Sequence, residues 1–165
     1  MTGDRTTDNE LVEIYLSDHA AAARAMIGRL RRMADSYDGE LAAVTAQLAE
    51  ALTRERDWIL EVMASDGLSV SRWKATATTL GELVGRLKLN GRLFQTSPLT
   101  PLLELELLAS GLRGKRSGWR TMREWAVELE LDTDQLTRWQ ADVEEQIEQV
   151  EALLAKQRLT AFKPR

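Results

Sequence analysis

The sequence predicts an all-α protein, a bundle of five helices, and three observations support this prediction. Apolar residues recur at helical spacing through five long segments, a pattern typical of helices with one buried face. Only three prolines and ten glycines occur in 165 residues, which leaves most of the chain free to form helix. The period-two alternation of a half-buried strand is negligible along the chain.

The five predicted helices are separated by turn signals. They extend over about Asn9–Ala34, Gly39–Ser65, Ser69 or Ser71 to Asn90–Gly91, Thr100–Val127 and Thr133–Leu159. In the fourth helix, Thr100 is expected to be the N-cap, with Pro101 as the first helical residue. Short connections place neighbouring helices antiparallel. The first two helices are therefore expected to form one hairpin, and the last two another.

The amino-acid composition limits which classes of protein the chain can belong to. A chain with 44% hydrophobic and 29% charged residues fits one globular domain, here residues 9–160, between tails at 1–8 and 161–165. The net charge of −4 gives no global reason to expect a nucleic acid or a membrane surface. The absence of cysteine excludes disulfides and thiolate chemistry. The sequence shows neither a signal peptide nor a membrane span, so a cytoplasmic location is expected.

Charged residues on apolar helix faces are the first candidates for a site, because burying a charge is unfavourable unless it is paired. His19 lies at the centre of the apolar face of the first helix, and Glu55 lies on that of the second. Both lie roughly 24 Å from the turn between these helices at 1.5 Å per residue, so a His19–Glu55 contact is predicted. Tyr15 and Asp18 lie at the edge of the same face.

Three interpretations of this polar cluster remain open. A His–Glu pair that is satisfied inside the bundle is favoured over a ligand or metal site formed by His19, Glu55 and Asp18. General acid–base catalysis is third, because one histidine and one carboxylate without a nucleophile define no reaction. Lys115 lies in the apolar arc of the fourth helix. Its ammonium group can reach an interior carboxylate or extend to solvent, and the second is favoured.

Four arginines form a stripe along one side of the fourth helix. They recur at spacings of three and four residues, at Arg113, Arg116, Arg120 and Arg123. Such a stripe can bind phosphate or nucleic acid. Ion pairing is favoured instead, because folding the last two helices into a hairpin places Glu144 level with Arg116 and Glu148 level with Arg113.

Glycines inside helices and a surplus of tryptophans indicate close packing. Gly81 and Gly85 precede a second group of glycines, which consists of Gly111, Gly114 and Gly118. Close approach of helices is favoured as the reason for them over space for a ligand. The tryptophans are expected in the core or at interfaces, and Trp125, away from its helix's apolar arc, is a candidate subunit contact.

The arrangement resembles the ferritin-like four-helix-bundle superfamily. Tyr15, Asp18 and His19 on the first helix, together with Glu55 on the next, are similar to the inward-facing polar positions of that family. The resemblance implies two hairpins joined by a long crossover within residues 67–100. Di-metal members carry Glu-x-x-His pairs, whereas here Trp58 follows Glu55 at that spacing. The chain is also similar to uncharacterised bacterial helical proteins with segments like Lys88–Gly91 and Gly111–Lys115.

The function expected from these patterns is a non-catalytic structural or protein-interaction bundle, as a homodimer or with another protein, and without a cofactor. A metal-binding or redox protein with a reduced ligand set around His19 and Glu55 is the alternative. A binder of an anionic ligand or nucleic acid through Arg113–Arg123 is the second alternative.

Overall fold

The computed structural model describes residues 7–65 and 99–162, and these residues form four α-helices. The helices are α1 (Asn9–Ser36), α2 (Gly39–Ser65), α4 (Thr100–Glu124) and α5 (Thr133–Arg158). The all-α class is therefore confirmed. The predicted third helix, with Gly81 and Gly85, lies outside the described residues.

Side-chain caps fix the starts of α1 and α5 where the sequence predicted them. The Asp8 carboxylate accepts hydrogen bonds from the backbone N–H groups of Glu10 and Leu11, at 3.0 and 3.3 Å. Asp132 does the same at the start of α5. Each cap satisfies two amide groups that have no partner inside the helix.

In α4 the predicted first residue, Thr100, is confirmed, but the predicted N-cap and the predicted end are wrong. Leu99, with no side-chain cap bond, precedes the helix, so Thr100 is already helical. The helix ends at Glu124 instead of Val127 because the chain reverses there. The backbone N–H of Leu131 donates to the carbonyl of Ala126 at 2.8 Å, and Glu130 has a positive φ of 50°. Ala126, which is buried in the core, anchors this turn.

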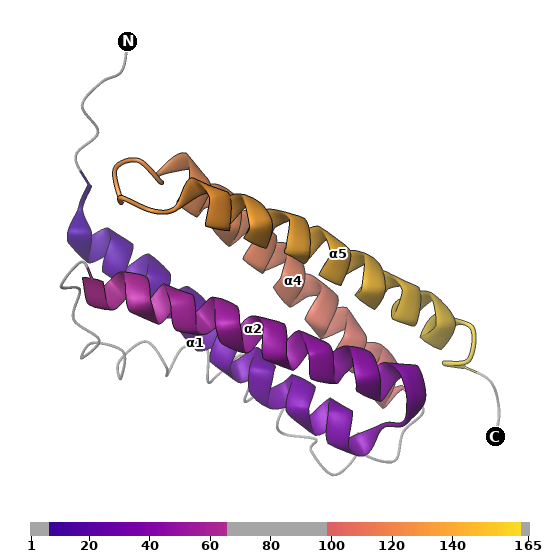
Figure 1. The fold of residues 1–165 in the computed structure, drawn as a ribbon. Coiled ribbons are helices and arrows are strands. Elements are labelled where there is room, and N and C mark those ends of the chain that lie inside the picture. The colour runs from indigo at the N-terminus through magenta and orange to yellow at the C-terminus, as the bar shows by residue number, and fades with distance from the viewer. Residues whose placement is uncertain (1–6, 66–98, 163–165) are drawn as a thin grey trace.

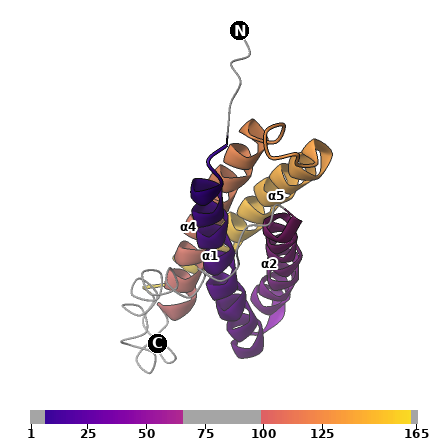
Figure 2. The same ribbon diagram turned by 90° about the vertical axis from the view of Figure 1, so that its left-hand side faces the viewer.

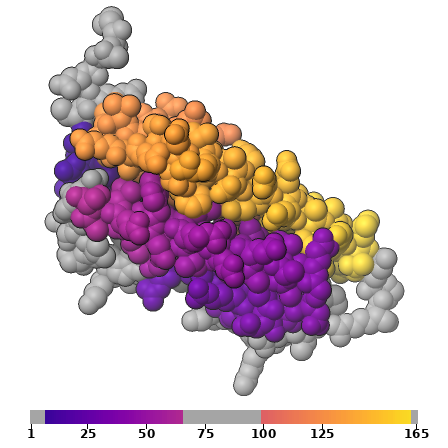
Figure 3. Space-filling view, in the orientation of Figure 1, coloured from indigo at the N-terminus to yellow at the C-terminus, as the bar shows by residue number. Residues whose placement is uncertain are grey.

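The four helices form two antiparallel hairpins, α1–α2 and α4–α5, which pack on each other (Figure 1). Helix α1 lies beside α4, and α2 lies beside α5; the space-filling view shows α2 and α5 adjoining along one face (Figures 2 and 3). Helix α2 ends at the opposite end of the bundle from the start of α4, so these two helices run parallel.

The buried side chains form two apolar clusters, one toward each end of the bundle. The first lies toward the α1–α2 turn and includes Leu52, Leu112 and Val150. The second lies toward the α4–α5 turn and includes Ile59, Trp119 and Val143. Each of these helices therefore contributes to both clusters. Between the two clusters, α2, α4 and α5 each place a polar residue at an interior position, and that layer is part of the candidate site.

A further polar network ties the hairpins together near the α1–α2 turn. The Glu104 carboxylate of α4 accepts hydrogen bonds from Tyr37 Oη at 2.7 Å and from Arg29 Nη1 at 3.0 Å. Burial and the adjacent Glu104 carboxylate raise the pKa of the Tyr37 hydroxyl. The network fixes the start of α4 against α1 and its turn.

Candidate functional site

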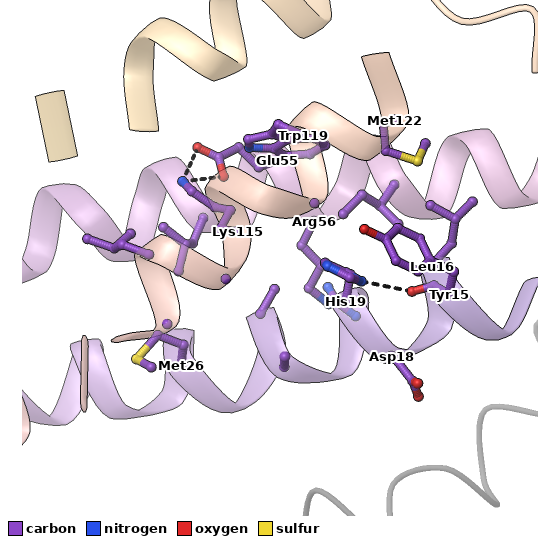
Figure 4. A pocket seen from close by; sticks show the side chains of 18 residues that line it. Tyr15, Leu16, Asp18, His19, Met26, Glu55, Arg56, Lys115, Trp119 and Met122 are labelled. Carbon is purple, nitrogen blue, oxygen red and sulfur yellow. Dashed lines mark hydrogen bonds and ion pairs between the residues drawn. The ribbon is translucent and has the colours of Figure 1, made fainter. Parts of the chain in front are cut away.

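A cavity of about 730 Å³ lies between α1, α2 and α4 at the level where the two apolar clusters meet (Figure 4). Its walls are largely aliphatic and aromatic, with Leu16, Leu52, Ile59, Leu112, Trp119 and Met122 among them. Asp18 and Gly114 lie on its exposed side. A space of this size falls within the range of pockets that bind small molecules.

The polar layer beside this cavity is a buried ion pair completed by an amide. Lys115 Nζ of α4 donates to both carboxylate oxygens of Glu55 of α2, at 2.8 and 2.6 Å. Gln146 of α5 accepts from Lys115 through Oε1 and donates to Glu55 Oε1 through Nε2, at 3.2 Å. All three partners satisfy one another, so three helices are joined by one closed network.

Burial shifts the pKa values of both members of this pair. The side chain of Glu55 is 3% exposed and that of Lys115 is 15% exposed. Burial raises the pKa of the Glu55 carboxyl, while Lys115 and Gln146 oppose that shift. Burial also lowers the pKa of the Lys115 ammonium, and Glu55 opposes that shift. In each case the unfavourable removal of a charge from water is the largest effect.

The expectation that Lys115 extends to solvent is wrong. An aliphatic stem can carry an ammonium group outward when no interior acceptor is available. Here Glu55 and Gln146 supply acceptors at the same level of the bundle, so the ammonium turns inward. Sequence reasoning missed Gln146. It lies in the apolar seam of α5, between Val143 and Val150, and that spacing was the available signal.

His19 lies at the same cavity, as its predicted height requires, but it has a different partner. Its Nδ1 is 2.9 Å from the backbone carbonyl of Tyr15, and its ring lies 4.3 Å from the Tyr15 ring. Since a carbonyl only accepts, Nδ1 carries the donated proton. Among the described residues, Glu55 bonds with α4 and α5 and not with His19, so the predicted His19–Glu55 contact is not formed.

Asp18, the remaining residue of the predicted cluster on α1, does not join His19 and Glu55 in one group. Asp18 lines the cavity from its exposed side, and its carboxylate points away from the Glu55–Lys115 pair (Figure 4). Within the described ranges, no group of three or more histidine, cysteine, aspartate or glutamate side chains is placed to hold a metal ion. The geometry of this cluster therefore does not support the metal-site alternative.

The glycines of α4 have two different roles. A Cβ atom at Gly118 would lie 2.8 Å from Cδ2 and Nε2 of His19, and one at Gly111 would lie 2.9 Å from the end of Met26. These two glycines allow α1 side chains to lie close against the α4 backbone, as the close-packing interpretation expects. A Cβ atom at Gly114, which lines the cavity, would meet nothing within 4 Å. At this position the glycine leaves open space.

Trp119 forms the aromatic part of the cavity wall. Its ring contacts Trp58 edge-on, at a centroid distance of 5.8 Å, and stacks with Trp139 at 6.2 Å. The residue is 3% exposed, and its buried indole N–H has no hydrogen-bond partner among the described residues. Trp125, the predicted subunit contact, is half-buried in the turn after α4.

The arginine stripe is paired within the chain. Arg116 and Arg120 form ion pairs with Glu144 of α5, at 3.3 and 3.6 Å. Arg113 pairs with Glu151, one turn beyond the Glu148 that was expected. Arg123 donates to Gln140 at 2.8 Å. Three of the four arginines thus form ion pairs within the chain, and each exposed pair adds little stability.

No family model, curated protein or solved structure matches the chain. The helices that the structure describes include none that is both long enough and apolar enough to cross a membrane.

Proposed function

We propose that this protein is a non-catalytic binding bundle that holds a small, largely apolar molecule in the cavity between α1, α2 and α4. The observation that carries the proposal is the cavity itself, which lies where the two apolar clusters meet. The cavity opens to solvent on one side, and a space of about 730 Å³ bordered largely by aliphatic and aromatic side chains has the size and lining of small-molecule sites. A bound molecule would supply the missing apolar contacts.

The saturation of the charged groups supports a non-catalytic role. A general base must be free to accept a proton from its substrate. The two oxygens of Glu55 already accept from Lys115 and Gln146, and the donors of Lys115 are directed to the same partners. The network therefore joins three helices and holds the cavity wall in place.

The proposal includes a ferritin-like arrangement of the helices. Two antiparallel hairpins with α2 parallel to α4 are compatible with a crossover bundle of that kind. In place of a metal-ligand layer, the interior of this bundle has an ion pair, an amide and a cavity. The cytoplasm is the proposed location.

Filling the cavity tests this function. Gly114→Phe adds a ring where a Cβ atom meets nothing within 4 Å, so the variant is expected to fold and to occupy the space. Binding of the uncharged fluorophore Nile red, measured by its fluorescence, is expected to weaken about tenfold or more, ~1.4 kcal/mol. Ser117→Phe, on the exposed side of the same helix, is the matched control and should bind as the wild type does. Equal binding by all three proteins would refute the cavity as the site.

Self-association is the second part of the proposal, and exposed apolar side chains support it. Leu11 and Ile14, near the start of α1, are 64% and 45% exposed. Val127, in the α4–α5 turn at the same end of the bundle, is 83% exposed. Light scattering is expected to give the mass of a dimer for the wild type and of a monomer for Leu11→Ser/Ile14→Ser. A monomeric wild type at micromolar concentration would contradict this part.

A further inference from the structure

The two ring nitrogens of His19 differ in their partners. Nδ1 lies 2.9 Å from the backbone carbonyl of Tyr15. Because a carbonyl can only accept, Nδ1 carries the proton of the neutral ring. Nε2 then keeps a lone pair and can accept one hydrogen bond. Among the described residues, no donor bonds to Nε2.

Nε2 of His19 is open to a molecule in the cavity. His19 lines the cavity and is only partly buried. The unpartnered Nε1 of Trp119 is fully enclosed, whereas Nε2 of His19 is not. Gly118 contributes to this access, because a Cβ atom at that position would lie 2.8 Å from Nε2 and would cover it. Nε2 is therefore an acceptor that a ligand can reach.

The charged pair in the cavity wall is not available to a ligand. Lys115 Nζ donates to both oxygens of Glu55, at 2.8 and 2.6 Å, and Gln146 completes the network. Asp18 lies at the exposed side of the cavity, and its carboxylate points away from this pair (Figure 4). Beside largely apolar walls, Nε2 of His19 is thus a group that can only accept and that requires a donor on the ligand.

We infer that the ligand of this cavity has an apolar body and a hydroxyl group that donates a hydrogen bond to His19 Nε2. This inference rests on the proposed function and adds the chemical class of the ligand, which is an apolar alcohol or phenol. A hydroxyl group supplies the donor without a charge, whereas an ammonium group would lose far more hydration between largely apolar walls. The contact with the Tyr15 ring, at 4.3 Å, helps to hold the imidazole in position for this bond.

Four probes with one carbon skeleton test the ligand class: 1-phenylethanol, acetophenone, ethylbenzene and the 1-phenylethylammonium ion. Calorimetry on the full chain measures each dissociation constant. The alcohol is expected to bind about fivefold more tightly than acetophenone, which lacks the donor, and at least about tenfold more tightly than the ammonium ion. Binding of either of these two as tightly as the alcohol would overturn the inference and leave the proposed function standing. Failure of all four to bind would refute the proposed function itself.

His19→Phe removes the acceptor and keeps an aromatic ring at the same position. The variant is expected to bind the alcohol and acetophenone with equal affinity, so the roughly fivefold preference for the alcohol is lost. Its affinity for ethylbenzene should stay within about twofold of the wild-type value, which shows that the cavity is intact. A preference for the alcohol that survives in the variant would overturn the inference.

Nuclear magnetic resonance gives a second readout that needs no variant, because His19 is the only histidine in the chain. At about pH 8, where an ordinary imidazole is uncharged, the nitrogen-15 spectrum should show the ring proton on Nδ1. The alcohol is expected to move the Nε2 resonance upfield, and ethylbenzene to leave it unchanged. A proton on Nε2 in the free protein, or an unmoved Nε2 resonance at saturation with the alcohol, would overturn the inference.

Discussion

Replacing one partner of the Glu55–Lys115 pair is expected to destabilise the protein by about 3–5 kcal/mol, because the other charge is then buried without a counter-charge. Glu55→Gln leaves the Lys115 ammonium without its carboxylate, and Lys115→Met leaves the Glu55 carboxylate with the Gln146 amide alone. The free energy of unfolding, measured in urea for each variant and the wild type, checks this prediction.

The double variant Glu55→Leu/Lys115→Met is the control. It removes both charges, so the expected free energy of unfolding is equal to that of the wild type or higher by about 1–4 kcal/mol. A double variant as unstable as the sum of the two single variants would contradict the role assigned to the pair. That outcome would mean that the side chains act by packing alone.

The free energies of unfolding of the two single variants should change with pH in opposite directions. In Lys115→Met, burial without the ammonium raises the Glu55 pKa further, so the folded state favours the protonated carboxyl. Stability is then highest below the unfolded value of about 4.3 and falls as pH rises through the folded pKa. In Glu55→Gln the lowered Lys115 pKa reverses the slope, and stability rises with pH toward about 10.4. Equal slopes in the two variants would be inconsistent with these shifts.

Two alanine substitutions in α4 are expected to have opposite effects. Gly118→Ala should lower the free energy of unfolding by about 1–3 kcal/mol, because its methyl group would lie 2.8 Å from the His19 ring. The ring cannot move away freely, since Nδ1 is bonded to the Tyr15 carbonyl. Gly114→Ala should raise the free energy of unfolding by about 1 kcal/mol, because the space is open and alanine favours helix. Thermal and urea unfolding measure both effects.

His19→Ala is the background variant that separates two contributions to the effect of Gly118→Ala on stability. These are the steric clash with the His19 ring and the higher helix propensity of alanine. In that background the ring is gone, so Gly118→Ala should become stabilising, as Gly114→Ala is in the wild type. If Gly118→Ala destabilises both backgrounds equally, His19 is not the obstructing group.

Much of the fold was predictable from the sequence because helix formation depends on local features. Apolar spacing and turn signals located three of the four described helices to within two residues at their ends. The end of α4 could not be predicted in this way. The chain reverses after Glu124 because Ala126 packs into the core and Leu131 bonds back to its carbonyl, and both contacts are tertiary or turn-specific.

The candidate site was predictable only as a set of residues at one height. Helical spacing identified His19, Glu55 and Lys115 as interior polar residues, and all three line the cavity. Their partners depend on how far each helix is rotated about its axis, and an error of one residue changes the facing side chain by about 100°. The partners of the arginine stripe were easier to predict, because Arg116 and Glu144 lie on one hairpin. The position of the turn fixes how far along each helix these residues lie.

By itself, the sequence determined the all-α class, the extents of three of the four described helices and the positions of polar residues on apolar helix faces, since these follow from periodicity along single helices. Tertiary structure alone decided that Glu55 pairs with Lys115 and Gln146, because those side chains come from three helices and meet only when the hairpins pack. It also decided that Gly118 touches His19 while Gly114 faces open space. Two glycines four residues apart are equivalent in a pattern, and only the neighbouring helix distinguishes them.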